Sequence, residues 1–330
     1  MKPSCTVFWF KRDLRLEDNE ALATAVREGE NLLLLYLLEP SLYQDPHYSE
    51  RHWDFIRQSL WELQQSLAAR GSRILCVREE ALTFFRQLQQ EYTLKAVYSH
   101  CETGIGRTYQ RDLALAHSLR TAGIPWKEYQ ANGVVRGLRD RTGWASAWQG
   151  YMSKPLAQVS WNKASLLPEQ AVRRLETRWR PMRLKAISEG VFQVGGRKAA
   201  LACMDSFFSE RIRNYSIHIS KPEASRSSCS RLSPYLAWGN LSIREVYQRL
   251  QVFKKEGRWR RQANAFGSRL RWHCHFIQKF EMEPRMEYEA INRAFIPMKQ
   301  PLRPEYIRAW ETGKTGYPLV DAAMRCLRET

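Results

Sequence analysis

Short apolar runs alternate with amphipathic segments throughout the first 130 residues. Strand-like runs lie at residues 6–10, 32–38, 73–77, 96–99 and 125–129, and helix-like segments lie between them at 19–27, 53–69, 81–91 and 109–122. Because strands that alternate with helices are joined by right-handed crossovers, this order predicts a parallel sheet covered on both faces. We therefore expect residues 1–130 to form a doubly wound, Rossmann-like α/β domain with five parallel strands. A ligand would bind in the crevice at the carboxyl ends of the strands.

Two short motifs suggest nucleotide-binding loops, and both fail on spacing. After Gly104 and Gly106 the dinucleotide fingerprint requires a third glycine, but Tyr109 occupies that position. Gly313-Lys314-Thr315 resembles the end of a phosphate-binding loop, but Arg308 stands where the first glycine of that loop is needed. The sequence therefore predicts no phosphate loop of either type.

The amino-acid composition of the chain changes after residue 130. Glycine and proline punctuate residues 131–195, and four tryptophans lie among them: Trp144, Trp148, Trp161 and Trp179. This composition predicts a long linker that crosses a surface and is pinned there by buried indoles. Helical periodicity dominates from residue 196, most clearly at 197–212, 242–255 and 263–280. We expect an all-α domain over residues 196–330.

The excess positive charge lies in one part of the chain. Residues 1–130 contain 16 Lys and Arg against 17 Asp and Glu, whereas residues 131–330 contain 36 against 17, for an overall charge of +18. A neutral part joined to a basic part favours a nucleic-acid partner over a generally solvated basic surface. We expect residues 131–330 to bind DNA with an affinity that falls steeply with salt, and residues 1–130 not to bind it.

Several other classes of protein are disfavoured. No apolar run is long enough to span a membrane, and a strand begins directly after Met1–Cys5, so we expect neither a membrane segment nor a signal peptide. Seven cysteines without a C-x-x-C pair indicate reduced thiols and a cytoplasmic location. No metal-ligand set and no Ser/His/Asp or Cys/His constellation is evident, so we assign no catalytic residue and no metal. Any difficult chemistry would need a bound cofactor.

Two clusters in the basic part can bind anions or bases. Ser230-Arg231-Leu232-Ser233-Pro234 places hydroxyls and one cation ahead of a helix, which suits a phosphate group, although an ordinary N-cap before proline explains it equally well. The second cluster interleaves cations with aromatics, as proteins do that bind single strands or flipped bases. A solvated basic face over an aromatic core is its alternative. Its members are Lys254, Lys255, Arg258, Trp259, Arg260, Arg261, Phe266, Arg269, Arg271, Trp272 and Phe276.

Three ordered motifs resemble the photolyase/cryptochrome family, in its cryptochrome-like branch. The first is residues 10–19, FKRDLRLEDN, which resembles the opening strand and turn of the family. The second combines Tyr215 and Pro222 with residues 230–236, SRLSPYL, and resembles the flavin-phosphate motif. The third, WETG followed by GYP and DAAMR over residues 310–325, resembles the entry to a helix of the cofactor domain.

The resemblance implies FAD as cofactor and specific roles for residues at matching positions. Tyr215 and Cys229, Ser230, Arg231, Leu232 and Ser233 would line the phosphates of FAD, and Phe266 would meet the flavin. Trp272 would stack on a flipped-out pyrimidine dimer in damaged DNA, and Arg269, His273 and Phe276 would complete the nucleic-acid face. The reduced flavin, excited by blue light, would donate an electron to the dimer. An antenna pigment of folate or deazaflavin type would occupy the α/β domain.

Four positions depart from the family pattern. Arg269 stands where repair enzymes carry a glutamate that contacts the dimer, and His273 replaces an arginine. Thr108 replaces a folate-contacting acid, and Gln300 replaces the outermost tryptophan of an electron chain. These substitutions leave open a blue-light receptor as the first alternative to DNA repair. A flavin-free fragment that binds nucleic acid through its basic face is the second alternative.

The end of the sequence produces a further expectation. Residues 318–330 have the apolar spacing of a helix with one buried face, but no glycine, asparagine or proline stop signal follows. We therefore expect the FAD-binding domain to be C-terminally truncated and the partner of this helix to lie beyond residue 330. On that expectation the chain alone would retain little FAD, and its repair activity would be impaired.

Overall fold

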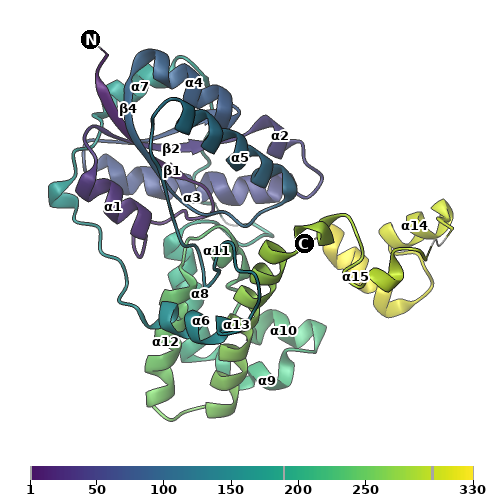
Figure 1. Cartoon of the computed structure of the whole chain (residues 1–330). Coiled ribbons are helices and arrows are strands. Elements are labelled where there is room, and N and C mark those ends of the chain that lie inside the picture. The colour runs from purple at the N-terminus through teal and green to yellow at the C-terminus, as the bar shows by residue number, and fades with distance from the viewer. Residues whose placement is uncertain (1, 189, 299–300, 330) are drawn as a thin grey trace. The chain divides into compact units, whose positions relative to one another are not determined.

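The computed structural model describes residues 2–188, 190–298 and 301–329 (Figure 1). Gln300 therefore lies outside the described residues. Contacts divide the chain into two compact units, the first formed by Met1–Ser188 and Val194–Pro284 and the second by Glu189–Gln193 and Arg285–Thr330. The domain boundaries expected at residues 130 and 195 fall within or at the edge of the first unit, and they stay a prediction.

A mainly parallel sheet forms the centre of the α/β part. Its order is β5-β4-β1-β2-β3-β6, and the parallel strands are β1 (Ser4–Phe10), β2 (Leu32–Leu37), β3 (Ile74–Arg78), β4 (Thr93–His100) and β5 (Trp126–Tyr129). This confirms the doubly wound fold class. The sixth strand, β6 (Arg180–Pro181), was not predicted and pairs antiparallel with β3 at the edge of the sheet. Its two residues are too few to produce a periodic signal, and proline suits an edge strand.

Helices cover both faces of the sheet, which explains why its inner strands β1, β2 and β3 are almost entirely buried, whereas β5 at the edge is polar and largely exposed. The covering helices are α1 (Glu20–Glu28), α2 (Pro40–Tyr43), α3 (Glu50–Ala68), α4 (Ala81–Glu91), α5 (Gly106–Thr121) and α7 (Glu169–Glu176). Successive strand residues point to opposite faces. Accordingly Phe8 and Phe10 enter the core shared with α1 and α3, whereas Val7 and Trp9 enter the core shared with α4 and α5.

The segment after β5 packs against the rest of the unit through its tryptophans. It contains α6 (Trp144–Ser153), a short 3-10 helix (Trp161–Lys163), α7 and β6. Trp144, Trp148 and Trp179 are buried, as predicted. Trp161 is partly buried, and the Arg70 guanidinium lies 4.7 Å from its ring centroid.

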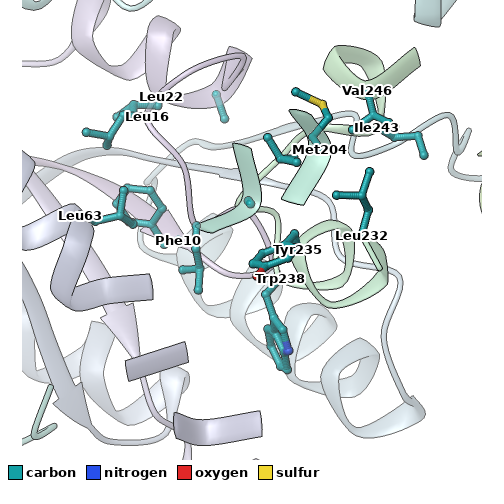
Figure 2. Close-up of a cluster of buried hydrophobic side chains, with 14 of the residues drawn as sticks. Phe10, Leu16, Leu22, Leu63, Met204, Leu232, Tyr235, Trp238, Ile243 and Val246 are labelled. Atoms are coloured by element: carbon teal, nitrogen blue, oxygen red, sulfur yellow. The ribbon is translucent and has the colours of Figure 1, made fainter. Parts of the chain in front are cut away.

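The helical part of the first unit shares a continuous core with the α/β part. It comprises α8 (Arg197–Ser209), a 3-10 turn (Arg211–Asn214), α9 (Tyr215–His218), α10 (Pro222–Ser228), α11 (Ser233–Ala237), α12 (Ile243–Lys255) and α13 (Arg260–Met282). Figure 2 shows Phe10 and Leu63 of the α/β part in the same cluster as Tyr235, Trp238 and Ile243. The helical predictions for this region are confirmed.

The loop after β1 joins these two parts through polar contacts. The Leu14 amide donates to the Trp238 carbonyl oxygen (3.0 Å), and the Asn240 amide group donates to the Leu14 carbonyl oxygen (3.3 Å). Gly239, at φ +73°, approaches so closely that a Cβ there would lie 2.3 Å from the Arg12 carbonyl oxygen. The buried Asp18 carboxylate accepts from Arg244 of α12, from the Ser242 hydroxyl and, at 2.9 Å, from the Ala157 amide. Residues 10–19 therefore serve to dock the helices.

Within its described residues, the second unit contains a 3-10 helix (Arg293–Phe295) and the α-helices α14 (Pro304–Glu311) and α15 (Pro318–Glu329). Asp321 holds the turn between them, because its carboxylate accepts from the Thr315 amide (2.7 Å) and the Gly316 amide (3.0 Å). Helix α15 confirms the predicted periodicity. Its apolar side chains Leu319 and Leu327 are exposed rather than buried within this chain.

Among the residues that the structure describes, no helix is long and apolar enough to cross a membrane.

Candidate cofactor and nucleic-acid site

The side chain of one arginine holds the segment between α10 and α11 in place. The Arg211 side chain donates to the carbonyl oxygens of Cys203 (2.6 Å), Cys229 and Ser230 (3.4 Å). Arg231 follows with φ +58°, a left-handed conformation that costs a residue with a Cβ about 1 kcal/mol or more. Leu232 is buried and anchors the segment to the core.

The segment presents polar side chains at the protein surface. Arg231 and Ser233 are exposed and Ser230 is partly exposed. Within the described chain, the hydroxyls of Ser230 and Ser233 make no hydrogen bond to protein. A guanidinium and two hydroxyls on a fixed backbone suit phosphate oxygens. These residues therefore fit the phosphate end of a dinucleotide such as FAD.

Tyr215 and Phe266 lie side by side in an aromatic cluster. Their ring centroids are 5.7 Å apart, and each also contacts Phe207, at 5.5 and 4.7 Å respectively. Burial raises the pKa of Tyr215 to about 12, so the phenol is neutral at physiological pH. Phe266 is 3% exposed. The structure thus gives both residues a packing role, and their contacts with FAD stay predictions.

Three of the four predicted nucleic-acid residues share one face of α13. Arg269, Trp272 and Phe276 follow the i, i+3, i+7 spacing of a helix stripe. The Arg269 guanidinium lies 4.4 Å from the Trp272 ring centroid, and the Trp272 and Phe276 rings meet edge to face at 6.1 Å. Trp272 is 49% exposed and Phe276 59% exposed. This face can offer an indole to a base and a cation to a phosphate.

His273 follows Arg269 by four residues on α13 but is less exposed than the stripe. It lines a cavity of about 190 Å³ together with Leu236, Ile277 and residues of the α/β part such as Lys11 and Glu102. Its Nδ1 atom is buried and has no hydrogen-bond partner within the described residues. Burial lowers the pKa of the imidazole, which favours its neutral form. The role of His273 at the nucleic-acid face stays a prediction.

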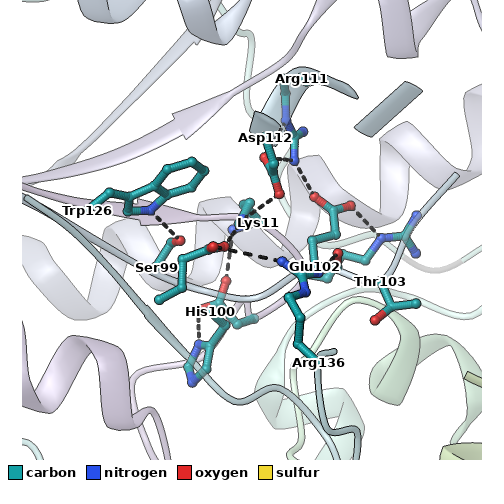
Figure 3. Close-up of polar contacts among 12 residues, drawn as sticks. Lys11, Ser99, His100, Glu102, Thr103, Arg111, Asp112, Trp126 and Arg136 are labelled. Carbon is teal, nitrogen blue, oxygen red and sulfur yellow. Dashed lines mark hydrogen bonds and ion pairs between the residues drawn. The ribbon is translucent and has the colours of Figure 1, made fainter. Parts of the chain in front are cut away.

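Charged side chains fill the crevice at the carboxyl ends of β1 and β4 (Figure 3). Arg111 binds Glu39 and Glu102, each at 2.6 Å, and Asp112 at 2.8 Å. Lys11 binds the other oxygen of Asp112 at 3.2 Å. Sequence reasoning missed this network, because its members come from four separate segments and sequence patterns relate only residues that are close in the chain.

The network shifts the acidities of its carboxyl groups in opposite directions. Burial opposes ionisation of Glu102, but Arg111, Arg12 and Lys11 outweigh it and lower the pKa to about 2. Burial raises the pKa of Glu39 to about 6, despite its contact with Arg111. Glu102 is therefore ionised at neutral pH, whereas Glu39 titrates closer to neutral pH than an ordinary glutamate does.

Residues of the crevice line two cavities, and one of them leaves little room for an antenna pigment. The cavity lined by Lys11, Arg12, Glu39, Glu102 and Arg111 has a volume of about 30 Å³, against about 190 Å³ for the one that His273 lines. Thr108, at the position of the expected folate contact, is buried and donates to the Ile105 carbonyl oxygen at 2.9 Å. Pigment binding stays a prediction.

The fold is an α/β domain packed on helices, with a segment at residues 229–233 that is predicted to bind phosphate. Models of two family domains match the chain: DNA photolyase over residues 6–140 and the FAD binding domain of DNA photolyase over residues 266–330. The chain belongs to the photolyase/cryptochrome family, and its FAD-binding domain identifies FAD as the cofactor.

Individual relatives include both branches of this family. The chain is 28% identical to the deoxyribodipyrimidine photo-lyase of Synechococcus sp., covering 98% of this chain and 70% of that protein. It is 27% identical to cryptochrome-2 of Gallus gallus, covering 98% and 59%. A structure of the archaeal photolyase from Sulfolobus tokodaii with two FAD molecules superposes with a TM-score of 0.72 at 25% identity, covering 99% and 71%.

Proposed function

We propose that this protein is an FAD-dependent, blue-light-driven DNA photolyase that acts on pyrimidine dimers. The observation that carries the proposal is the exposed face formed by Arg269, Trp272 and Phe276. All three residues lie within the part of the chain that matches the FAD-binding domain. Stacking of a base on an aromatic side chain is worth about 1–3 kcal/mol, and a flipped dimer presents two bases. Relatives named deoxyribodipyrimidine photo-lyase support the same activity at the level of the family.

The residues of the chain would divide the work between cofactor and DNA. Bound FAD supplies the light-excited electron that splits the dimer. Ser230, Arg231 and Ser233 would bind its phosphates, and the neutral Tyr215 would line them without adding a charge. Trp272 stacks on the flipped dimer while the guanidinium of Arg269 neutralises an adjacent phosphate.

The test combines a repair assay with a binding assay. The chain is incubated with FAD, and the loss of cyclobutane dimers from UV-irradiated oligothymidylate is measured under blue light. We expect dimer loss in the light, in proportion to the FAD that the chain retains, and none in the dark. Trp272→Ala should weaken binding to the damaged oligonucleotide about tenfold, the value of one lost stacking contact.

Tyr109→Ala is the matched control, because Tyr109 is similarly exposed (46%) but lies on α5. It should leave binding unchanged. Failure of the FAD-loaded chain to remove dimers would contradict the proposal. DNA binding without any bound flavin absorbance would favour the flavin-free alternative.

A blue-light receptor is the second candidate, and Arg269 favours it. A cation stands over the indole at the position where the repair enzymes of the resembling family carry a glutamate. In a receptor, light would change the flavin absorbance without any loss of dimers. Arg269→Glu would then be expected to create or increase dimer binding, which can be measured with the same oligonucleotide.

We also propose a cytoplasmic location. Cys5, Cys76, Cys101, Cys203, Cys229 and Cys274 are free thiols, as is usual for proteins of a reducing compartment.

A further inference from the structure

A groove lies at the carboxyl ends of β2 and β3, on the sheet edge that β6 completes. Its volume is about 720 Å³, within the range of small-molecule sites. Leu38 and Arg78 lie at the ends of these strands, and residues 180–185 form the opposite wall. Carboxyl ends of parallel strands are the usual place for ligands in such sheets.

The lining of the groove is strongly cationic. It contains five cations and no carboxylate among the described residues: Arg57, Arg78, Arg180, Arg183 and Lys185. Two of these cations form ion pairs with an acidic residue outside the groove lining: Asp54 contacts Arg57 (2.8 Å) and Lys185 (2.6 Å). Within the described chain, Arg180 and Arg183 have no ion pair or side-chain hydrogen bond.

The pairing of β3 with β6 adds a second observation. Arg78 and Arg180 are directly opposite each other in the ladder. Like charges in this position destabilise a sheet. The aromatic ring of Tyr43 stabilises the charge of Arg78 but not that of Arg180, because the ring centroid lies 4.9 Å from the Arg78 guanidinium. An anion between the two arginines would remove the repulsion.

The floor of the groove is apolar. Leu38 and Met182 are each 5% exposed, and Pro181 lies between the arginines of the opposite wall. A ligand that matches this lining has several negative charges at one end and a flat, weakly polar body at the other. Guanidinium groups bind phosphate oxygens in pairs of hydrogen bonds.

We propose that this groove binds a nucleoside di- or triphosphate. The phosphates lie between Arg78, Arg180 and Arg183, and the base covers Leu38 and Met182. The site is separate from the FAD segment at residues 229–233 and from the charged crevice of Figure 3, and it requires neither flavin nor DNA.

Calorimetric titration of the chain with ATP tests the proposal. We expect ATP to bind more tightly than AMP, and adenosine to bind least, because affinity follows the number of phosphates. Arg180→Gln combined with Arg183→Gln should weaken ATP binding at least about tenfold. Both side chains are exposed, so the double variant should keep its circular dichroism spectrum and unfolding midpoint.

A matched control separates the site from general electrostatics. Arg86→Gln combined with Arg174→Gln removes the same charge from exposed positions of α4 and α7 and should leave ATP binding within about twofold. Arg231→Gln, in the FAD segment, should also leave it unchanged. Equal weakening by all these variants, or no binding of ATP by the unchanged chain, would overturn the proposal. Inorganic tripolyphosphate binding as tightly as ATP would overturn the nucleotide assignment.

Discussion

At the scale of single residues, the buried Asp18 carboxylate is the main electrostatic link between the β1 loop and α12. It is 3% exposed and hydrogen-bonded to Arg244 and Ser242. Asp18→Asn would keep the left-handed backbone (φ +45°), which asparagine tolerates, but leave Arg244 buried without its counter-charge. We expect a loss of about 3 kcal/mol in the free energy of unfolding, measured with urea.

The effect of this substitution should depend on pH. Burial opposes ionisation of Asp18, but Arg244 and Ser242 outweigh it and lower the pKa of the folded state below its ordinary value of 3.8. A carboxyl with a lowered pKa stabilises the fold above its unfolded pKa, and this stabilisation is lost as the pH falls through the folded pKa. The difference between the two proteins should therefore shrink in acid. A difference that persisted unchanged below pH 3 would contradict this assignment.

The contribution of Glu39 to the pH dependence of stability should have the opposite sign to that of Asp18. Burial raises its pKa from 4.5 to about 6, so the folded state binds a proton more tightly than the unfolded state. Its contribution should therefore reduce the free energy of unfolding by up to about 2 kcal/mol as the pH rises from 4.5 to above 6. Urea unfolding of Glu39→Gln across this range should lack that decrease, whereas Glu223→Gln, at an exposed position of α10, should keep it.

At the scale of elements, the contact between the β1 loop and α11 depends on the absence of a side chain at Gly239. An added Cβ would lie 2.3 Å from the Arg12 carbonyl oxygen and 2.6 Å from the Asp13 Cα. Both obstacles are backbone atoms, so the two elements must separate. We expect Gly239→Ala to lower the free energy of unfolding by about 3 kcal/mol, from overpacking together with an unfavourable backbone angle.

Gly257→Ala isolates the backbone contribution. Gly257 has nearly the same angle (φ +75° against +73°), but an added Cβ there would meet nothing within 4 Å. Its cost should be about 1 kcal/mol. Similar losses in the two variants would mean that the close approach at Gly239 contributes nothing.

The elements that sequence patterns predicted well are those with long, regular signals. Strands β1, β2 and β3 are covered on both faces and are therefore nearly continuous apolar runs, and α13 shows its spacing over several turns. Strand β6 was not predicted, because two residues are too few to show an alternating pattern and their partner strand β3 lies about 100 residues earlier in the chain. Helix α15 was recognised by its spacing, although its apolar residues are exposed in this chain.

The candidate site was predictable to the extent that its residues share one element. Arg269, Trp272, His273 and Phe276 lie on one helix, so the positions carried over from the family fall at neighbouring places on α13. Among them, His273 also lines a cavity with residues of the α/β part, a contact that no pattern within the helix could indicate. The charged crevice and the cationic groove both arise from segments far apart in the chain, which no local pattern could bring together.

At the scale of the whole molecule, the division of charge makes a prediction about DNA binding. The cations that follow residue 130 include an exposed group at the junction of α12 and α13, formed by Lys255, Arg258 and Arg261, with Trp259 41% exposed among them. If these cations contact phosphates, each releases counterions on binding. The logarithm of affinity then falls with the logarithm of salt concentration by about 0.9 for each contact.

Replacing Lys255, Arg258 and Arg261 by glutamine should therefore reduce that slope by as much as about 3. The slope can be measured by fluorescence anisotropy of labelled DNA over a series of salt concentrations. Arg86, Lys95 and Arg120, replaced together, remove the same charge from exposed positions of the α/β part, and they should leave the slope unchanged. Equal reductions by the two triple variants would mean that DNA senses only the net charge of the protein. A reduction confined to the first variant would place the DNA-binding surface on the helical side of the charge boundary.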